Sequence, residues 1–92
     1  MIADLAVSIV IYRSGGGFLA VCPEFGCEAT GGSPEDAREG ALAAVRRRLD
    51  AVSAEGRLEE VLARAGFVVD GGQLRAERRP IRIDEAILPV PF

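Results

Sequence analysis

The amino-acid sequence predicts an α+β protein in which antiparallel strands pack against one long helix. Three observations predict this class. The first 31 residues hold short, strand-forming apolar runs separated by glycine and proline turns. Residues 34–54 carry apolar side chains three and four positions apart, the spacing of an amphipathic helix. Shorter helix and hairpin patterns follow. This order favours helices on one face of a sheet.

The first three expected strands form an antiparallel meander. Residues 5–12 and 18–22 are rich in apolar, strand-forming side chains, and the glycines of residues 13–17 allow a turn between them. Pro23 ends the second strand, because proline lacks the backbone N–H that a ladder needs. A second turn then leads into a short third strand at residues 27–31.

The long helix is expected to begin after Ser33 and to run to about Ala54. Ser33 is a favourable N-cap, and Pro34 suits the first helical position. Gly56 follows as the expected stop. Alanines beside the apolar stripe would let the helix lie close to a sheet. The stripe consists of Leu42, Val45, Leu49 and Val52.

Three further elements are expected in the second half of the chain. Residues 57–65 have an apolar face and predict a shorter helix. Residues 67–77 contain Asp70 and Gly71 between two strand-forming runs, which is a strong hairpin signal. Alternating apolar side chains then predict a closing strand at residues 81–88, and prolines follow it as at a sheet edge.

The length of the chain limits how many domains it can form. The 92 residues suffice for one small domain, residues 1–92, in which residues 55–80 form a helix-and-hairpin insertion before the closing strand. A domain of this size buries only ~60% of its unfolded surface, so oligomerisation would help to stabilise it. We find no membrane-spanning run and no signal-peptide pattern, and we expect a cytoplasmic protein without membrane contact.

The composition excludes several kinds of chemistry. The chain has no histidine, so one chain cannot build a Ser-His-Asp or Cys-His catalytic site. Two cysteines without histidine cannot complete a four-ligand zinc site. A net charge of −3 argues against direct nucleic-acid binding, which depends on neutralising phosphates. The sequence therefore predicts no catalytic residue, no cofactor and no metal.

The two cysteines flank the second turn of the meander. Cys22 and Cys27 would face each other across this hairpin. In a reducing cytosol we interpret them as small buried side chains. A disulfide under oxidation and a four-thiol zinc site shared between two chains are the alternatives.

Charged side chains form two groups. Acids gather near the second turn and the helix start, at Glu24, Glu28, Glu35 and Asp36. In one interpretation they are solvated and favour the helix N-terminus. In the other they form an acidic rim that meets a basic partner. The basic residues Arg46–Arg48, Arg78 and Arg79 are interpreted as solvated surface, and a weak RNA contact by the arginine run is the alternative.

Residues 15–45 resemble the HicB-like antitoxin family. The resemblance consists of a Pro-acid-apolar turn, a short strand that ends in glycine, and an acid-rich helix start. The matching residues are Pro23, Glu24, Phe25, Gly31, Ser33, Glu35, Asp36 and Ala37. Two features depart from the family pattern. The turn lacks a second proline, and no DNA-binding helical or ribbon-helix-helix domain fits after residue 56.

The resemblance implies a partial RNase H-like fold and a homodimer or higher oligomer. It also implies a non-enzymatic role, in which the protein binds and neutralises a small HicA-like toxin that cleaves mRNA. Partner contacts are then expected at the sheet edge and at the acidic turn region. The candidate contact residues are Glu24, Phe25, Glu28, Glu35 and Asp36.

Two alternative functions stay open at the sequence level. The first is a HicB-fold domain that binds a ligand or a regulatory protein and has no toxin partner. The second is a metal-dependent RNase, which needs several carboxylates that converge on metal ions. The middle of the first expected strand is Val7-Ser8-Ile9, so no acid lies where that chemistry would need one.

Overall fold

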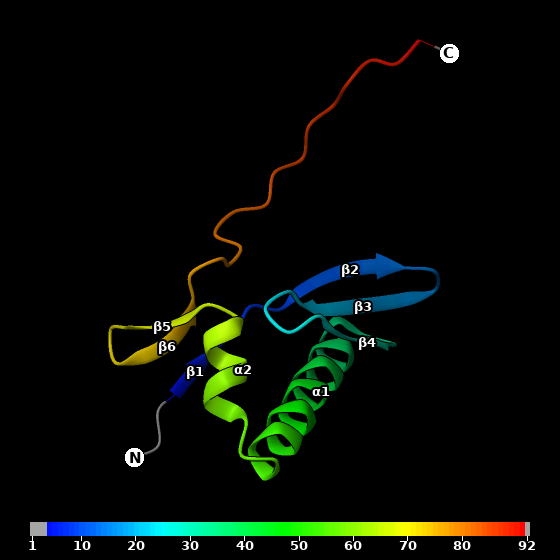
Figure 1. The fold of residues 1–92 in the computed structure, drawn as a ribbon. Coiled ribbons are helices and arrows are strands. Elements are labelled where there is room, and N and C mark those ends of the chain that lie inside the picture. Colours follow the sequence, from blue (N-terminus) through cyan, green and yellow to red (C-terminus); the bar gives the residue numbers. More distant parts are fainter. Residues whose placement is uncertain (1–3, 92) are drawn as a thin grey trace.

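The computed structural model describes residues 4–91, which form six strands and two helices. The strands form two separate three-stranded sheets. Figure 1 shows the long helix under one sheet and the short helix beside the other. The molecule is α+β, as the sequence predicts. The elements are β1 (Asp4–Ala6), β2 (Val10–Ser14), β3 (Gly17–Cys22), β4 (Cys27–Gly31), α1 (Pro34–Ala54), α2 (Leu58–Arg64), β5 (Phe67–Asp70) and β6 (Gln73–Ala76).

Strands β2, β3 and β4 form the predicted antiparallel meander. Tyr12 on β2 pairs with Leu19 on β3, and Leu19 pairs in turn with Thr30 on β4. Gly15 and Gly26 have φ angles of 59° and 66° at the two turns. Glycine adopts this left-handed conformation without strain because it has no Cβ.

Helix α1 begins and ends where the sequence predicts. The Ser33 side-chain hydroxyl accepts a hydrogen bond from the backbone N–H of Asp36 at 3.1 Å, and Pro34 occupies the first turn. This cap satisfies one of the N–H groups that have no partner within the helix. Gly56 has a φ of 70° just beyond the helix, as expected of a residue that ends it.

The core between α1 and the meander is built from small side chains. Ala20 on β3 and Ala37 and Ala41 on α1 are fully buried and in mutual contact. Gly40 adds to this close approach, because a Cβ placed there would lie 2.9 Å from the Cβ of Ala29 on β4. Helix and sheet therefore lie too close together for larger residues at these positions.

The second sheet has the order β1-β6-β5. Strands β5 and β6 form the predicted hairpin, in which Gly71 has a φ of 61°. Strand β1 pairs with β6 in parallel, and Asp4 lies opposite Gln73. Helix α2 precedes this hairpin and ends before Gly66, whose φ is 79°.

The predicted single strand at residues 5–12 is wrong in one respect. It is divided into β1 and β2, which belong to different sheets, and residues 7–9 cross between them. The backbone N–H of Ser8 donates its hydrogen bond to the Glu24 carboxylate instead of to a neighbouring strand. A side chain from the second turn of the meander thus holds the break in place.

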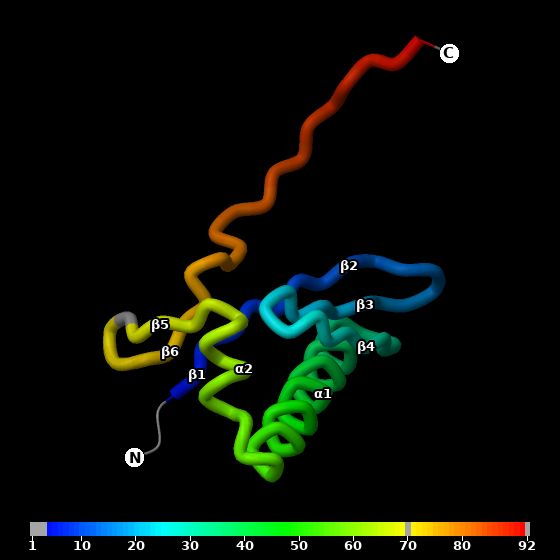
Figure 2. The backbone as a smooth tube through the Cα atoms, in the orientation of Figure 1, coloured from blue at the N-terminus to red at the C-terminus, as the bar shows by residue number. Residues whose placement is uncertain are grey.

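The predicted closing strand at residues 81–88 is also wrong. Residues 77–91 contain no helix or strand, and the last strand within residues 4–91 is β6, which lies beside β1. Residues 81–91, termed the C-terminal arm, are exposed throughout and extend away from the rest of the chain (Figures 1 and 2). Alternation signals a strand only where a sheet edge pairs with it, and Pro80 removes a backbone donor at the root of the arm.

Candidate partner-binding surface

The turn between β3 and β4 holds two of the five predicted contact residues, Glu24 and Phe25. The backbone N–H groups of Phe25 and Gly26 both donate to the carbonyl of Cys22, at 3.3 and 2.9 Å. This tight turn places both side chains against parts of the chain that are distant in the sequence. Glu24 reaches the segment between β1 and β2, and Phe25 reaches β5.

Glu24 fastens the turn to the crossing segment. Its Oε1 accepts the hydrogen bond from Ser8, and the thiol of Cys22 lies 3.7 Å from the same oxygen. Its Oε2 is buried and has no hydrogen-bond partner among the residues that the structure describes. A buried acceptor without a partner is costly.

Phe25 joins the meander to the second sheet. Its ring stacks on the ring of Phe67 on β5, with centroids 5.4 Å apart and an interplanar angle of 22°. This distance falls in the range of attractive aromatic pairs. Glu24 and Phe25 thus hold the fold together, and their predicted role in partner contact stays a prediction.

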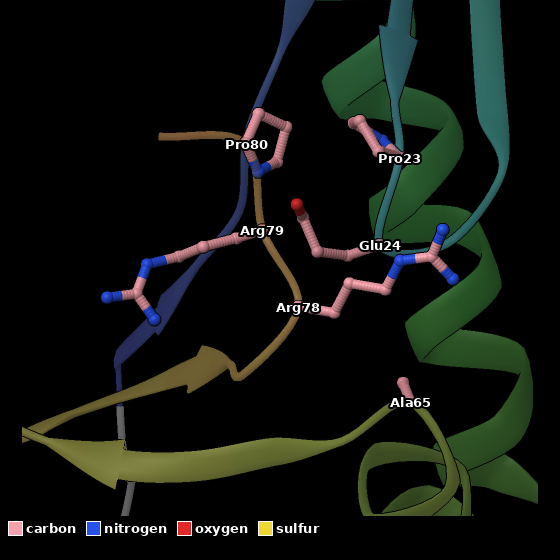
Figure 3. Close-up of a pocket in the computed structure, with 6 residues that line it drawn as sticks. All are labelled: Pro23, Glu24, Ala65, Arg78, Arg79 and Pro80. Carbon is pink, nitrogen blue, oxygen red and sulfur yellow. The ribbon is translucent and has the colours of Figure 1, made fainter. Parts of the chain in front are cut away.

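A surface cavity of about 580 Å³ lies beside the turn. In Figure 3 the Glu24 side chain reaches toward Pro80, while the Arg79 side chain points away from Glu24. The Nη1 of Arg79 donates to the carbonyl of Ala76 at 3.0 Å. The cavity is lined by Pro23, Glu24, Ala65, Arg78, Arg79 and Pro80. Sequence reasoning did not connect the two arginines with Glu24, since more than 50 positions separate them in the chain.

Glu28 lies on the side of the meander that faces away from α1. Side chains alternate along a strand, and Ala20 and Ala29 face α1, so their neighbours point the other way. No helix or strand of the described residues lies over this side (Figure 1). We term it the outer sheet face, and by strand register it consists of Val10, Tyr12, Leu19, Val21, Glu28 and Thr30.

Glu35 and Asp36 lie at the opposite end of β4 from Glu24. Both are exposed in the first turn of α1, where acidic side chains favour the helix dipole. The five residues of β4 span about 16 Å between the two ends. The five predicted contact residues therefore occupy three places, namely the turn, the outer sheet face and the helix start.

The outer sheet face is the surface that sequence reasoning missed, although its signal is present. Leu19 and Val21 alternate with Phe18, Ala20 and Cys22, so β3 is apolar on both faces. Such a strand is typical of a sheet covered on both sides. In the described part of this chain, α1 covers one of these sides and no helix or strand covers the other.

Cys22 and Cys27 lie directly opposite each other where β3 and β4 meet the turn, and both are free thiols. Cys22 is fully buried, in agreement with its interpretation as a small core side chain. The pKa of the Cys22 thiol is raised from 9.0 to about 11, chiefly by burial and also by the nearby Glu24 carboxylate, while a hydrogen bond from the Phe25 backbone opposes the rise. Cys27 is only partly buried.

We expect iodoacetamide at pH 8 to alkylate Cys27 well before Cys22 in the folded protein. Alkylation requires an accessible thiolate, and Cys22 is both protonated and buried. The folded protein binds the Cys22 proton more tightly than the unfolded chain does. The stability that this proton contributes is therefore fully present below about pH 9 and is lost as the pH rises through about 11. Peptide mass mapping after timed labelling measures both rates, and the unfolded chain is the control. Equal native rates would contradict the expectation.

Within residues 4–91, no three or more histidine, cysteine, aspartate or glutamate side chains are grouped so that they could hold a metal ion. No helix in that range is long and apolar enough to cross a bilayer. No protein-family model, curated protein or solved structure matches the chain. The candidate surface is therefore defined by geometry, burial and charge.

Proposed function

We propose that this protein is a non-enzymatic module of the HicB-like type, which binds and neutralises a small HicA-like mRNA interferase. The observation that carries the proposal is the outer sheet face. It presents apolar side chains from the central strand, and no helix or strand within residues 4–91 lies over it.

The composition of the outer sheet face suits a protein partner. The open side of an antiparallel sheet is ordinarily polar, because it faces water. Here Leu19 and Val21 lie at the centre, with the exposed Tyr12 on one side and the polar Glu28 and Thr30 along β4. An apolar centre with a polar rim is the usual anatomy of a protein–protein interface.

Charge supports a basic partner. The chain carries a net charge of −3, and Glu28, Glu35 and Asp36 are all exposed. A toxin that grips RNA needs a basic surface to neutralise phosphates, and an acidic surface would attract and orient it. Docking on the outer sheet face would then cover the RNA-binding surface of the toxin, so inhibition needs no catalytic step.

The second candidate function is a HicB-fold domain that binds a ligand or a regulatory protein without a toxin. The cavity beside Glu24 favours it, because about 580 Å³ is within the range of small-molecule sites. Its lining combines the Glu24 carboxylate with Arg78, which suits a polar ligand. A thermal-shift screen of polar metabolites with the purified chain would detect such a ligand.

Co-expression with the protein of the neighbouring small reading frame tests the antitoxin proposal. We expect a small basic protein to copurify and to lose its RNA-cleaving activity in the complex. Glu28→Arg should weaken the complex at least about tenfold, because it places positive charge against a basic surface. Binding is measured by titration calorimetry.

Glu59→Arg is the matched control, since Glu59 is exposed on α2 and the change in charge is the same. The Glu59→Arg variant should bind the partner with an affinity within about twofold of the unsubstituted protein, because salt screens a charge that lies far from the interface. Failure of any basic partner to copurify would reject the antitoxin role. Equal weakening by both variants would show that the outer sheet face is not the interface.

A further inference from the structure

The C-terminal arm is a long apolar segment without cover. Ile81 and Ile87 are each 90% exposed, and Ile83, Leu88 and Val90 are exposed as well. Globular proteins rarely leave so many large apolar side chains in contact with water within one continuous segment. The arm therefore needs a surface to bind.

Strand β2 has an open edge that could pair with the arm. Among the strands of residues 4–91 it is the outermost of its sheet, and it pairs only with β3. Edge strands are commonly protected by proline or by charged side chains along the edge. β2 contains no proline, and the guanidinium of its one charged residue, Arg13, lies over the ring of Phe18. Tyr12, in the middle of β2, is 53% exposed.

The topology of the chain leads the arm toward this edge. β1 and β6 are parallel, with Leu5 opposite Leu74. If this offset continued past residues 7–9, which cross to the other sheet, and past residues 77–80, Ile81 would lie beside Tyr12 on β2. Instead, the arm turns away after Pro80 and extends clear of the rest of the molecule (Figures 1 and 2). The β2 edge and the segment that could pair with it are thus both left open.

We propose that the arm of one copy pairs with the β2 edge of a second copy, and that the exchange is reciprocal. A segment that can complete its own sheet can complete the same sheet of an identical chain, which is the usual route to an exchanged two-fold dimer. The arm occupies the edge and leaves the outer sheet face accessible. This dimer goes beyond the proposed toxin binding and forms without a toxin.

The length of the arm is sufficient for a stable interface. Its eleven residues amount to about 1.2 kDa of the 9.7 kDa chain, and an extended segment of that mass exposes roughly 1,700 Å². Burying half of this against an equal area of the second copy removes about 1,700 Å² from water for each arm. Two arms remove about twice that, whereas a standard interface buries roughly 1,600 Å² in total.

Light scattering of the full-length chain during size-exclusion chromatography provides the first test. The expected mass is twice the 9.7 kDa of the chain. The variant Ile83→Asp/Ile87→Asp should raise the dimer dissociation constant at least about 100-fold. Because both side chains are exposed in the isolated chain, their replacement leaves its fold intact. The control Arg82→Gln/Asp84→Asn removes only the ion pair within the arm and should remain dimeric.

Photo-crosslinking identifies the surface that the arm occupies. A benzophenone amino acid replaces Tyr12 in an equal mixture of ¹⁴N- and ¹⁵N-labelled full-length chains. We expect crosslinks from position 12 to residues 81–91, with mixed-isotope pairs among them. A monomeric wild-type chain, a dimer that survives Ile83→Asp/Ile87→Asp, or crosslinks confined to single-isotope pairs would each overturn the proposal.

Discussion

Replacing Gly31 with alanine is expected to lower the free energy of unfolding by about 2–3 kcal/mol, near the upper end for an overpacked site. A Cβ at this position would lie 2.6 Å from the backbone nitrogen of Ala37 and 2.8 Å from the Cβ of Asp36. These atoms belong to the first turn of α1, so relief requires the helix to move away from β4. Urea unfolding followed by circular dichroism measures the change.

The adjacent glycine provides the control. A Cβ at Gly32 would meet nothing within 4 Å, so Gly32→Ala should change stability by less than about 0.5 kcal/mol. The two variants alter the composition and the unfolded chain in the same way and differ only in what surrounds the added methyl group. Similar losses at both positions would show that α1 does not lie this close to β4.

Phe67→Ala is expected to cost about 3–4 kcal/mol, as is usual when a buried phenylalanine is truncated. Phe67 is 9% exposed and forms the stack with Phe25 that joins β5 to the turn of the meander. Its loss removes both the buried area and the contact between the two sheets. Thermal and urea unfolding measure the effect.

Val69→Ala is the control on the same strand. Val69 is 77% exposed, so its truncation should cost less than about 0.5 kcal/mol. The double variant Phe25→Ala/Phe67→Ala adds a second check, because two rings in contact give a non-additive loss. Strict additivity would mean that the two rings do not stack in solution.

Local patterns in the sequence were sufficient for the meander and for α1. Gly26 and Pro23 mark a turn, and Ser33 with Pro34 marks a helix start, through physics that involves only near neighbours. The hairpin of β5 and β6 was predictable for the same reason. These elements place Glu28 on β4 and Glu35 and Asp36 in the first turn of α1, so the acids that the sequence analysis grouped together are spread over separate places.

Long-range pairing was not predictable in the same way. The apolar run at residues 5–12 gives no sign that the chain changes sheets at Ser8, because its hydrogen-bond partner, Glu24, lies 16 positions away. The parallel pairing of β1 with β6 joins the two ends of the folded region. No local pattern connects Phe25 with Phe67, the ring on which it stacks, because the two residues are distant in the sequence.

The direction of the second sheet affects how the protein can be fused to other sequences. Because β1 and β6 are parallel, Asp4 lies opposite Gln73, and the arm leaves from the other end of β6. An affinity tag placed before Asp4 therefore joins this sheet at the end opposite the root of the arm. A tag placed after the arm is attached directly to the exposed apolar segment and can obstruct its pairing. An amino-terminal fusion is accordingly the design that leaves both the arm and the β2 edge unobstructed.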